Sequence, residues 1–204
     1  MKKLAIDDFR LMLHRALAGI KEREGEFSQL DALTGDGDHG TAIVTALSAA
    51  VMVAEKGTDF KTMLNDMGFA VMMETSGSTS TLLGAFFLGM SDVASGTGLD
   101  ATGVKAMFSG GLANVGKQTK ARIGDKTMMD SLIPAVDAME SCTSDEIDDL
   151  FSAAAAAAQR GAEATVDMTA KFGRARNYGE RSIGFMDSGA ASWSAMFAAF
   201  AMLG

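Results

Sequence analysis

The amino-acid sequence predicts an all-α protein whose helices run alternately up and down in a bundle. Among 204 residues there is 1 proline, whereas alanine is abundant and there are 16 methionines, and both abundant types favour helices. Stretches that alternate apolar and polar residues with period two, as half-buried strands do, are hard to find. Apolar residues recur instead at the three- and four-residue spacing of amphipathic helices.

Breaks at glycine and turn clusters divide the chain into eight expected helices. Their ranges are 4–24, 41–56, 59–74, 78–93, 100–118, 126–140, 144–171 and 189–203. The first, third and fifth carry apolar stripes, which are Ile6-Phe9-Leu13-Leu17-Ile20, Phe60-Met63-Leu64-Met67-Ala70-Val71 and Val104-Met107-Phe108-Leu112-Val115. Turns rich in glycine, aspartate and hydroxyl residues precede the second, fourth, sixth and eighth.

Start signals and composition support the same helices. Asp59 and Asp100 occupy N-cap positions of the third and fifth helices, and Thr143-Ser-Asp-Glu146 has the spacing of a capping box before the seventh. The alanine run 153–158 in that helix predicts the close approach of a neighbouring helix. Methionines at helical spacing beside leucine and phenylalanine are interpreted as core residues.

Length and charge limit the classes of function. No linker divides residues 1–204, so we expect a single domain. The net charge of −8 argues against a nucleic-acid partner, because phosphate backbones bind basic surfaces. One cysteine, Cys142, excludes an internal disulfide framework and fits a reducing compartment. Asp7 and Asp8 stand where a signal peptide needs an apolar run, and the longest apolar segment is too short to span a bilayer. We therefore expect a cytoplasmic protein that does not bind membranes.

Asp31, Asp36 and Asp38 crowd into eight residues, with glycines between them. These carboxylates repel one another unless a cation is present, and Mg²⁺ prefers carboxylate and phosphate oxygens. The cluster therefore predicts a metal–phosphate site. The pattern Gly35-x-Gly37-x-x-Gly40 matches a dinucleotide fingerprint but lacks the preceding buried strand, and a calcium loop would need a further acidic residue. An acidic turn that only caps the helix starting near Thr41 is the open alternative.

Four turns are expected at one end of the bundle if the helices alternate in direction. They are 31–41, 76–81, 123–127 and 187–189. Each precedes a helix N-terminus, where free amides and the helix dipole favour anions. The hydroxyls of Ser76, Ser78, Thr79 and Ser80 either donate to phosphate or act as ordinary caps. The convergence predicts a bound polyphosphate.

Two basic segments interrupt the acidic chain. Residues 171–181 contain four cations and one glutamate, a net charge of +3, and arginines such as Arg174 pair bidentately with phosphate. The second segment comprises Lys117, Lys120, Arg122 and Lys126. For this one a solvated face and a functional role remain equal alternatives.

Two other patterns are set aside. Residues 111–118 resemble a Walker A loop, but the metal-binding hydroxyl is missing and a helical stretch replaces the required strand. Neither His14 nor His39 has an evident serine or cysteine partner for nucleophilic catalysis. We interpret His14 as structural and His39 as either a nucleotide contact or a helix-start residue.

Four motifs in order resemble the L subunit, the nucleotide-binding part, of dihydroxyacetone kinases over nearly the whole chain. They are Gly35-Asp-Gly-Asp-His-Gly40, Ser76-Gly-Ser-Thr-Ser-Thr-Leu-Leu-Gly84, Gly124-Asp-Lys-Thr-Met128, and Gly173-Arg-Ala-Arg-Asn-Tyr-Gly-Glu-Arg-Ser-Ile-Gly184 followed by Asp187-Ser-Gly189. The resemblance implies an eight-helix antiparallel barrel with ATP or ADP and two Mg²⁺ ions at one end.

The resemblance also implies roles for individual residues and partners. The metal ligands, which are the catalytic residues, would be Asp31, Asp36 and Asp38. Positions that line the nucleotide would be His39, Gly40, Ala42, Ser78, Thr79, Met128, Arg174, Asp187 and Gly189, with the adjacent Thr41 and Ser188. A separate K subunit would carry the sugar. In one branch of the family a phosphohistidine subunit, M, recharges bound ADP, and in the other ATP exchanges freely.

The chain departs from the family pattern around the nucleotide turns. The departures are Ser76, Ser80, Thr81, Thr119, Phe185 and Ser188. They bear on the base and ribose contacts and on the choice of sugar more than on the metal site. The alternatives to a dihydroxyacetone kinase subunit are a nucleotide-sensing regulatory module and a kinase subunit for another short ketose, such as erythrulose. The sequence does not determine the phosphate donor or the oligomeric state, and a homo-oligomer is one alternative.

Overall fold

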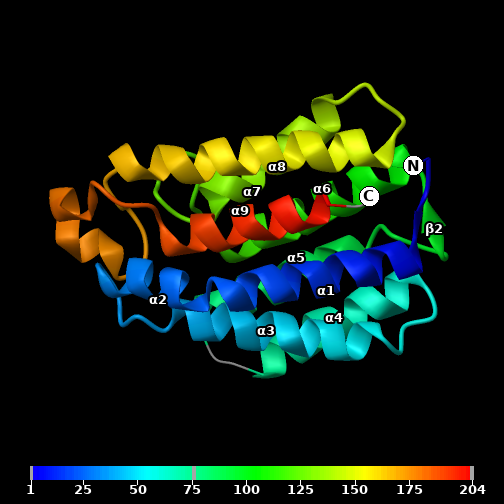
Figure 1. Ribbon diagram of the computed structural model, residues 1–204, viewed down its shortest axis with the longest axis horizontal. Coiled ribbons are helices and arrows are strands. Elements are labelled where there is room, and N and C mark those ends of the chain that lie inside the picture. Colours follow the sequence, from blue (N-terminus) through cyan, green and yellow to red (C-terminus); the bar gives the residue numbers. More distant parts are fainter. Residues whose placement is uncertain (1, 75–76, 203–204) are drawn as a thin grey trace.

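The computed structural model describes residues 2–74 and 77–202, and these are mainly helical (Figure 1). The α-helices in the described residues are α1 (Ile6–Glu22), α2 (Glu24–Ala32), α3 (His39–Ala54), α4 (Phe60–Glu74), α5 (Ser78–Ser91), α6 (Ala101–Gln118), α7 (Met129–Ser141), α8 (Ile147–Ala164) and α9 (Ser188–Phe200). Two short 3₁₀ helices, η1 (Thr165–Asp167) and η2 (Ala175–Ser182), lie between α8 and α9. The strands β1 (Leu4–Ala5) and β2 (Gly98–Leu99) pair antiparallel.

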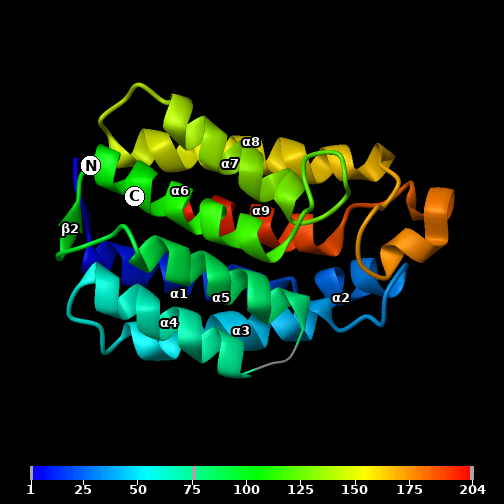
Figure 2. The same cartoon turned by 180° about the vertical axis from the view of Figure 1, so that it is seen from behind.

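Eight of the helices close into a barrel. In the order α1, α3, α4, α5, α6, α7, α8, α9, each helix packs against the next, and α9 packs against α1. Successive helices of this ring run in opposite directions, as the two views show (Figures 1 and 2). The prediction of an all-α antiparallel barrel is therefore confirmed. Helix α2 was not predicted, and it packs against α3 and α9 at one end of the barrel.

The first expected helix, 4–24, is wrong at both ends. Leu4 and Ala5 form β1 rather than helical backbone, and Arg23 (φ −107°, ψ 11°) separates α1 from α2. Helix α2 has one buried residue, Phe27, over whose ring the Arg23 guanidinium lies at 5.0 Å. A short charged helix with one buried residue has no apolar stripe, so periodicity could not reveal it.

The seventh expected helix, 144–171, is also shorter than predicted. It begins at Ile147, with Glu146 as N-cap, so the capping box expected from Thr143 is not formed. It ends at Ala164, where the chain tightens into η1 and the Thr165 hydroxyl donates to the Ala162 carbonyl. The N-caps at Asp59 and Asp100 are confirmed by their hydrogen bonds. The Asp59 carboxylate accepts the Thr62 N–H at 3.0 Å, and the Asp100 carboxylate accepts the Gly103 N–H at 2.8 Å.

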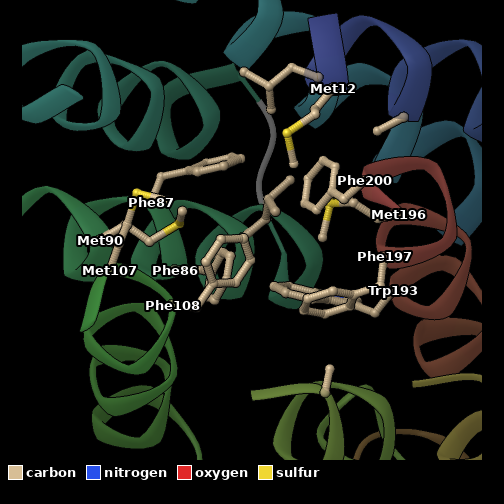
Figure 3. Packing of buried hydrophobic residues seen from close by; sticks show 14 of the residues in the cluster. Met12, Phe86, Phe87, Met90, Met107, Phe108, Trp193, Met196, Phe197 and Phe200 are labelled. Atoms are coloured by element: carbon tan, nitrogen blue, oxygen red, sulfur yellow. The ribbon is translucent and has the colours of Figure 1, made fainter. Parts of the chain in front are cut away.

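Large apolar side chains fill the barrel (Figure 3). The ring of Phe86 lies edge-on to Trp193, with centroids 5.0 Å apart, a geometry that adds to the stabilisation by burial. Most methionines join this core as predicted, including Met12, Met63, Met67, Met90, Met107, Met129, Met139 and Met196. The interpretation was wrong for three exposed ones, Met52, Met73 and Met202.

The alternation of directions separates two sets of connections. The N-termini of α3, α5, α7 and α9 lie at one end of the barrel, together with α2 and η2, whereas the pair β1 and β2 lies at the other end (Figure 1). In the described part of the chain, no helix combines the length and the apolar character that a membrane crossing requires.

Candidate functional site

A cavity of about 610 Å³ opens at the end of the barrel where the four turns meet. This volume lies within the range of roughly 300–1,000 Å³ that is common for small-molecule sites. The predicted site residues in its lining are Asp31, Asp36, Asp38, His39, Ala42, Ser78, Thr79, Met128, Arg174, Asp187, Ser188 and Gly189. Residues distant in sequence thus share one wall, as the expected convergence of the turns requires. Ser76 lies outside the described residues.

The three aspartates come together on one side of the cavity. One carboxylate oxygen from each of Asp31, Asp36 and Asp38 lies within 4.8 Å of the others. Asp31 is in the last turn of α2, and its Oδ2 accepts the Gly37 N–H at 2.8 Å, which folds the turn back over the helix end. Gly37 has φ 77°, a left-handed conformation that a side chain would strain. The glycines therefore shape the turn that gathers the charges.

The electrostatics of the cluster show a deficit of positive charge. Partial burial and the charges of Asp36 and Asp31 raise the pKa of Asp38. The one cation that pairs with the cluster within the described residues is Arg174, whose Nη1 forms an ion pair with Asp36 Oδ2. The hydrogen bond from Arg174 lowers the pKa of Asp36. Three hard oxygen donors that already attract a guanidinium fit a divalent cation such as Mg²⁺.

Asp187 begins α9 and joins two parts of the wall. Its Oδ2 accepts the Ala190 N–H at 2.8 Å as an N-cap, and its own N–H donates to Thr165 Oγ1 at 2.9 Å. Its carboxylate is half-buried, and desolvation raises its pKa to about 7 despite the hydrogen bond from Ala190 and the charge of Lys126. The cavity therefore holds an acid that titrates near neutrality.

His39, at the first position of α3, is 9% exposed and contacts the N-terminal parts of α5 and α9. Its Nδ1 lies 3.2 Å from Thr79 Oγ1 and its Nε2 lies 2.9 Å from Ser192 Oγ. Burial lowers the pKa of His39, which favours the neutral ring. The serine partner was not evident from sequence because it lies 153 residues away. Ser192 is 1% exposed and donates to the Gly189 carbonyl, so this contact links α3 to α9 and does not present a nucleophile.

Gly40 and Thr41 do not line the cavity, although they were predicted with the nucleotide-binding residues. A Cβ at Gly40 would lie 2.1 Å from the Glu24 carbonyl and 2.5 Å from Ser28 Oγ, so this glycine allows α2 to pack on α3. Thr41 is exposed and donates to Glu24 Oε1 at 3.0 Å. Both face α2, the helix that the sequence did not reveal, and both secure its position.

Two lining residues, Lys126 and Trp193, were not among the predicted site residues. Lys126 belongs to the second basic segment, for which a solvated face was one alternative, but it is 3% exposed and lines the cavity. The motif Gly124-Asp-Lys-Thr-Met128 includes Lys126 but not the other cations of that segment, so it was the signal for a role of Lys126 in the site. Trp193 also lines the cavity, and the sequence offered no motif that included it. His14 lies elsewhere on α1, where its Nε2 is 2.5 Å from Glu55 Oε1.

Some departures from the family pattern also fall in the wall. Thr119, Phe185 and Ser188 line the cavity, and Ser188 Oγ lies 3.5 Å from Asp31 Oδ1. The hydroxyls of Ser80 and Thr81 donate to the Gly77 carbonyl at 3.3 and 2.8 Å, as hydroxyls in the first turn of a helix often do. The departures thus lie in or beside the wall of the site, and one of them, Ser188, contacts the aspartate cluster.

Comparisons with known proteins agree with this arrangement. Residues 33–202 match the DAK2 domain family. The chain is 32% identical over 206 residues to PEP-dependent dihydroxyacetone kinase 2, ADP-binding subunit DhaL, of Listeria innocua serovar 6a, covering 96% of this chain and 95% of that protein. It is 32% identical over 183 residues to L-erythrulose 1-kinase of Mycolicibacterium smegmatis, covering 87% of this chain and 32% of that one.

Among solved structures, dihydroxyacetone kinase from C. freundii in complex with AMP-PNP and Mg²⁺ is similar in fold. The TM-score is 0.73 and the identity 25%, over 93% of this chain and 32% of that chain. A family match over most of the chain and a relative of equal length together decide the assignment. The chain belongs to the DAK2 domain family.

Proposed function

We propose that residues 1–204 form one domain that binds Mg²⁺ and an adenine nucleotide and acts as the L subunit of a dihydroxyacetone kinase. In this proposal it transfers a phosphoryl group from the bound nucleotide to a short ketose on a separate K subunit. The observation that carries the proposal is the aspartate cluster, with carboxylate oxygens within 4.8 Å of one another, in a cavity ringed by helix N-termini. The relatives named as ADP-binding subunits support the choice of nucleotide.

The residues of the cavity divide into two sets of roles. Asp31, Asp36 and Asp38 would hold the metal, for which two ions are expected from the family resemblance. The N-termini of α5 and α9, at Ser78 and Ser188, offer amides and positive dipole ends to phosphate oxygens. When bound, Mg²⁺ would neutralise charge on the β- and γ-phosphates and favour in-line transfer.

The other groups position and shield the nucleotide. His39, whose pKa is lowered by burial, is hydrogen-bonded to Thr79 and Ser192, so it orients two walls of the cavity. Apolar side chains such as Leu82, Met128 and Trp193 provide a surface for a base. Fixed groups of this kind contribute to catalysis mainly by positioning and electrostatics.

The exposure of the cluster supports a partner that carries the sugar. The side chains of Asp36 and Arg174 are 47% and 64% exposed, so the charged part of the cavity is open to solvent. A hydroxyl nucleophile held on another protein could therefore approach there. A phosphohistidine subunit would use the same opening to recharge bound ADP.

Phosphoryl transfer tests the proposal. The chain is incubated with its genomic K partner, dihydroxyacetone and either ATP or a phosphohistidine carrier, with and without EDTA. We expect metal-dependent formation of dihydroxyacetone phosphate that needs both subunits. Nucleotide binding without transfer to any K partner would favour a sensing role instead.

The similarity to L-erythrulose 1-kinase favours one second candidate, a kinase subunit for a four-carbon ketose. Under this alternative the L chain has the same chemistry, and the K partner selects the sugar. The assay is therefore repeated with erythrulose. A higher kcat/KM for erythrulose than for dihydroxyacetone would establish this alternative.

A further inference from the structure

Lys126 has a backbone and a burial that distinguish it from the other cations of the chain. Its φ is 59°, in the left-handed region, and it is the one non-glycine residue with positive φ among those described. Residues held in this region commonly mark functional sites. Its side chain is 3% exposed, although it lies in the cavity wall. A buried cation in a strained turn needs specific partners to offset its desolvation.

Those partners are two backbone carbonyls, one at the start and one near the end of segment 165–187, which connects α8 to α9. Lys126 Nζ donates to the Thr165 carbonyl and to the Phe185 carbonyl, both at 2.5 Å. It also lies 4.9 Å from the centre of the Phe185 ring. Segment 165–187 leaves the barrel at Thr165 and returns at Asp187. The lysine therefore fastens the start of this segment to its end.

Two further contacts extend this arrangement. The Gly184 N–H donates to the Val166 carbonyl at 2.8 Å, which joins the start and the end of segment 165–187 next to the lysine. The turn that carries the lysine is itself fixed, because Asp130, 1% exposed, accepts the N–H groups of Gly124 and Thr127 at 2.6 and 2.8 Å. The lysine thus links a turn that is fixed by Asp130 to the two ends of segment 165–187.

The segment that Lys126 fastens carries two of the charged groups of the proposed nucleotide site. Arg174 projects from it to the aspartate cluster, and Asp187 ends it at the N-terminus of α9. The Asp187 N–H donates to Thr165 Oγ1, in the residue whose carbonyl accepts from Lys126. A shift of the anchored ends of segment 165–187 would move Arg174 and Asp187 relative to the aspartate cluster.

We propose that Lys126 is a positioning residue that clamps segment 165–187 so that Arg174 meets the phosphate end of the bound nucleotide. The inference rests on the proposed nucleotide site, but the clamp itself can be tested without nucleotide. Because the clamp acts on the nucleotide through Arg174, it predicts that the effects of Lys126 and Arg174 on Mg·ADP affinity are coupled. A lysine that merely supports the barrel predicts no such coupling.

A double-mutant cycle measures this coupling. Lys126→Met, Arg174→Met and the double variant are compared with the wild type for Mg·ADP affinity by calorimetry. We expect Lys126→Met to weaken binding about 10-fold or more, because small misplacements of positioning groups have large effects. Arg174→Met should then cause a much smaller further loss in the Lys126→Met background than in the wild type. Losses that multiply independently, or an unchanged affinity in Lys126→Met, would overturn the proposal.

Hydrogen exchange supplies the measurement that needs no nucleotide. In Lys126→Met, amides of 165–187 should exchange faster than in the wild type, while those of α1 and α4 keep their protection. Lys117→Met, which removes an exposed lysine of the same basic segment, is the matched control and should change neither measurement. Uniformly faster exchange throughout the barrel would assign Lys126 a general structural role and overturn the clamp.

Two outcomes are kept distinct by this design. If the wild type fails to bind Mg·ADP, the proposed function fails, whereas the exchange experiment still decides whether Lys126 fastens the segment. If Lys126→Met does not fold, Lys126→Arg retains the donors and charge but is larger, and the same cycle applies to it. A weaker Mg·ADP affinity in Lys126→Arg that multiplies independently with the loss in Arg174→Met would again count against the clamp.

Discussion

Arg174, in the segment between α8 and α9, forms an ion pair with Asp36, in the turn between α2 and α3. The two residues are 138 positions apart by their numbers, and they meet because alternate turns of the barrel share one end. The guanidinium supplies positive charge to a cluster that has too little of it. A metal ion and Arg174 would therefore compete for the Asp36 carboxylate.

This competition gives the first prediction. Arg174→Met should raise the affinity for Mg²⁺ or Mn²⁺ alone, because Asp36 is released, but should weaken the binding of Mg·ADP, because a phosphate partner is lost. Metal titration and calorimetry measure the two affinities separately. Arg176→Met removes an exposed arginine of the same segment that does not line the cavity, and it should leave both unchanged. A fall in both affinities for Arg174→Met would contradict the competition.

The second prediction concerns the pH dependence of stability. Folding raises the pKa of Asp187 to about 7, so the folded protein holds this proton more tightly than the unfolded chain does. The contribution of this group to stability is present below about pH 4, is lost as the pH rises to about 7, and is constant above. Asp187→Asn keeps a capping oxygen and cannot ionise.

The stability of Asp187→Asn relative to the wild type should therefore increase between pH 5 and pH 8. We expect a change of up to about 2 kcal/mol, a value reduced from the full linkage because the carboxylate is only half-buried. Urea unfolding of the nucleotide-free proteins at both pH values measures it. A difference between the two proteins that is the same at pH 5 and pH 8 would refute the raised pKa.

The third prediction concerns Gly40. A Cβ there would lie 2.1 Å from the Glu24 carbonyl, so Gly40→Ala must push α2 away from α3. We expect a loss of about 1–3 kcal/mol in the free energy of unfolding. Mg·ADP binding should weaken as well, because Asp31 lies in the last turn of α2.

Gly19→Ala is the matched control for this substitution. Gly19 lies inside α1, and a Cβ there would meet nothing within 4 Å. Replacing a helical glycine without a clash should stabilise the protein by about 0.5–1 kcal/mol. Chemical denaturation of both variants gives the comparison. A Gly40→Ala protein as stable as Gly19→Ala would show that α2 is not packed as described.

The barrel and the aspartate cluster could be predicted from sequence for different physical reasons. Apolar stripes report burial along each long helix, so each of the eight expected helices corresponds to a helix of the ring and differs from it mainly at its ends. The cluster Asp31, Asp36 and Asp38 was visible because its residues are close in sequence. The pairing of Asp36 with Arg174 was not, because it depends on how distant turns meet.

Each feature that the sequence did not reveal depends on one residue and not on a repeated pattern. Helix α2 buries only Phe27, so it gave no periodic signal. Lys126 was grouped with exposed lysines because charge alone does not reveal burial or a positive φ. Residues 165–171 were predicted as a continuation of the seventh helix. The course of segment 165–187 is set instead by long-range hydrogen bonds, from Lys126 to the Thr165 carbonyl and from Lys171 to the Gly124 carbonyl.

The central claim is that the aspartate cluster binds nucleotide through a metal, and Asp36→Asn tests it most directly. Asp36 is exposed and its ion pair is with Arg174, so the variant should keep the helical circular dichroism of the wild type. We predict that the wild type binds ADP with Mg²⁺ and loses this affinity in EDTA, and that Asp36→Asn binds Mg·ADP at least about 10-fold more weakly. Equal Mg·ADP affinity in Asp36→Asn and the wild type, measured by calorimetry, would contradict the claim.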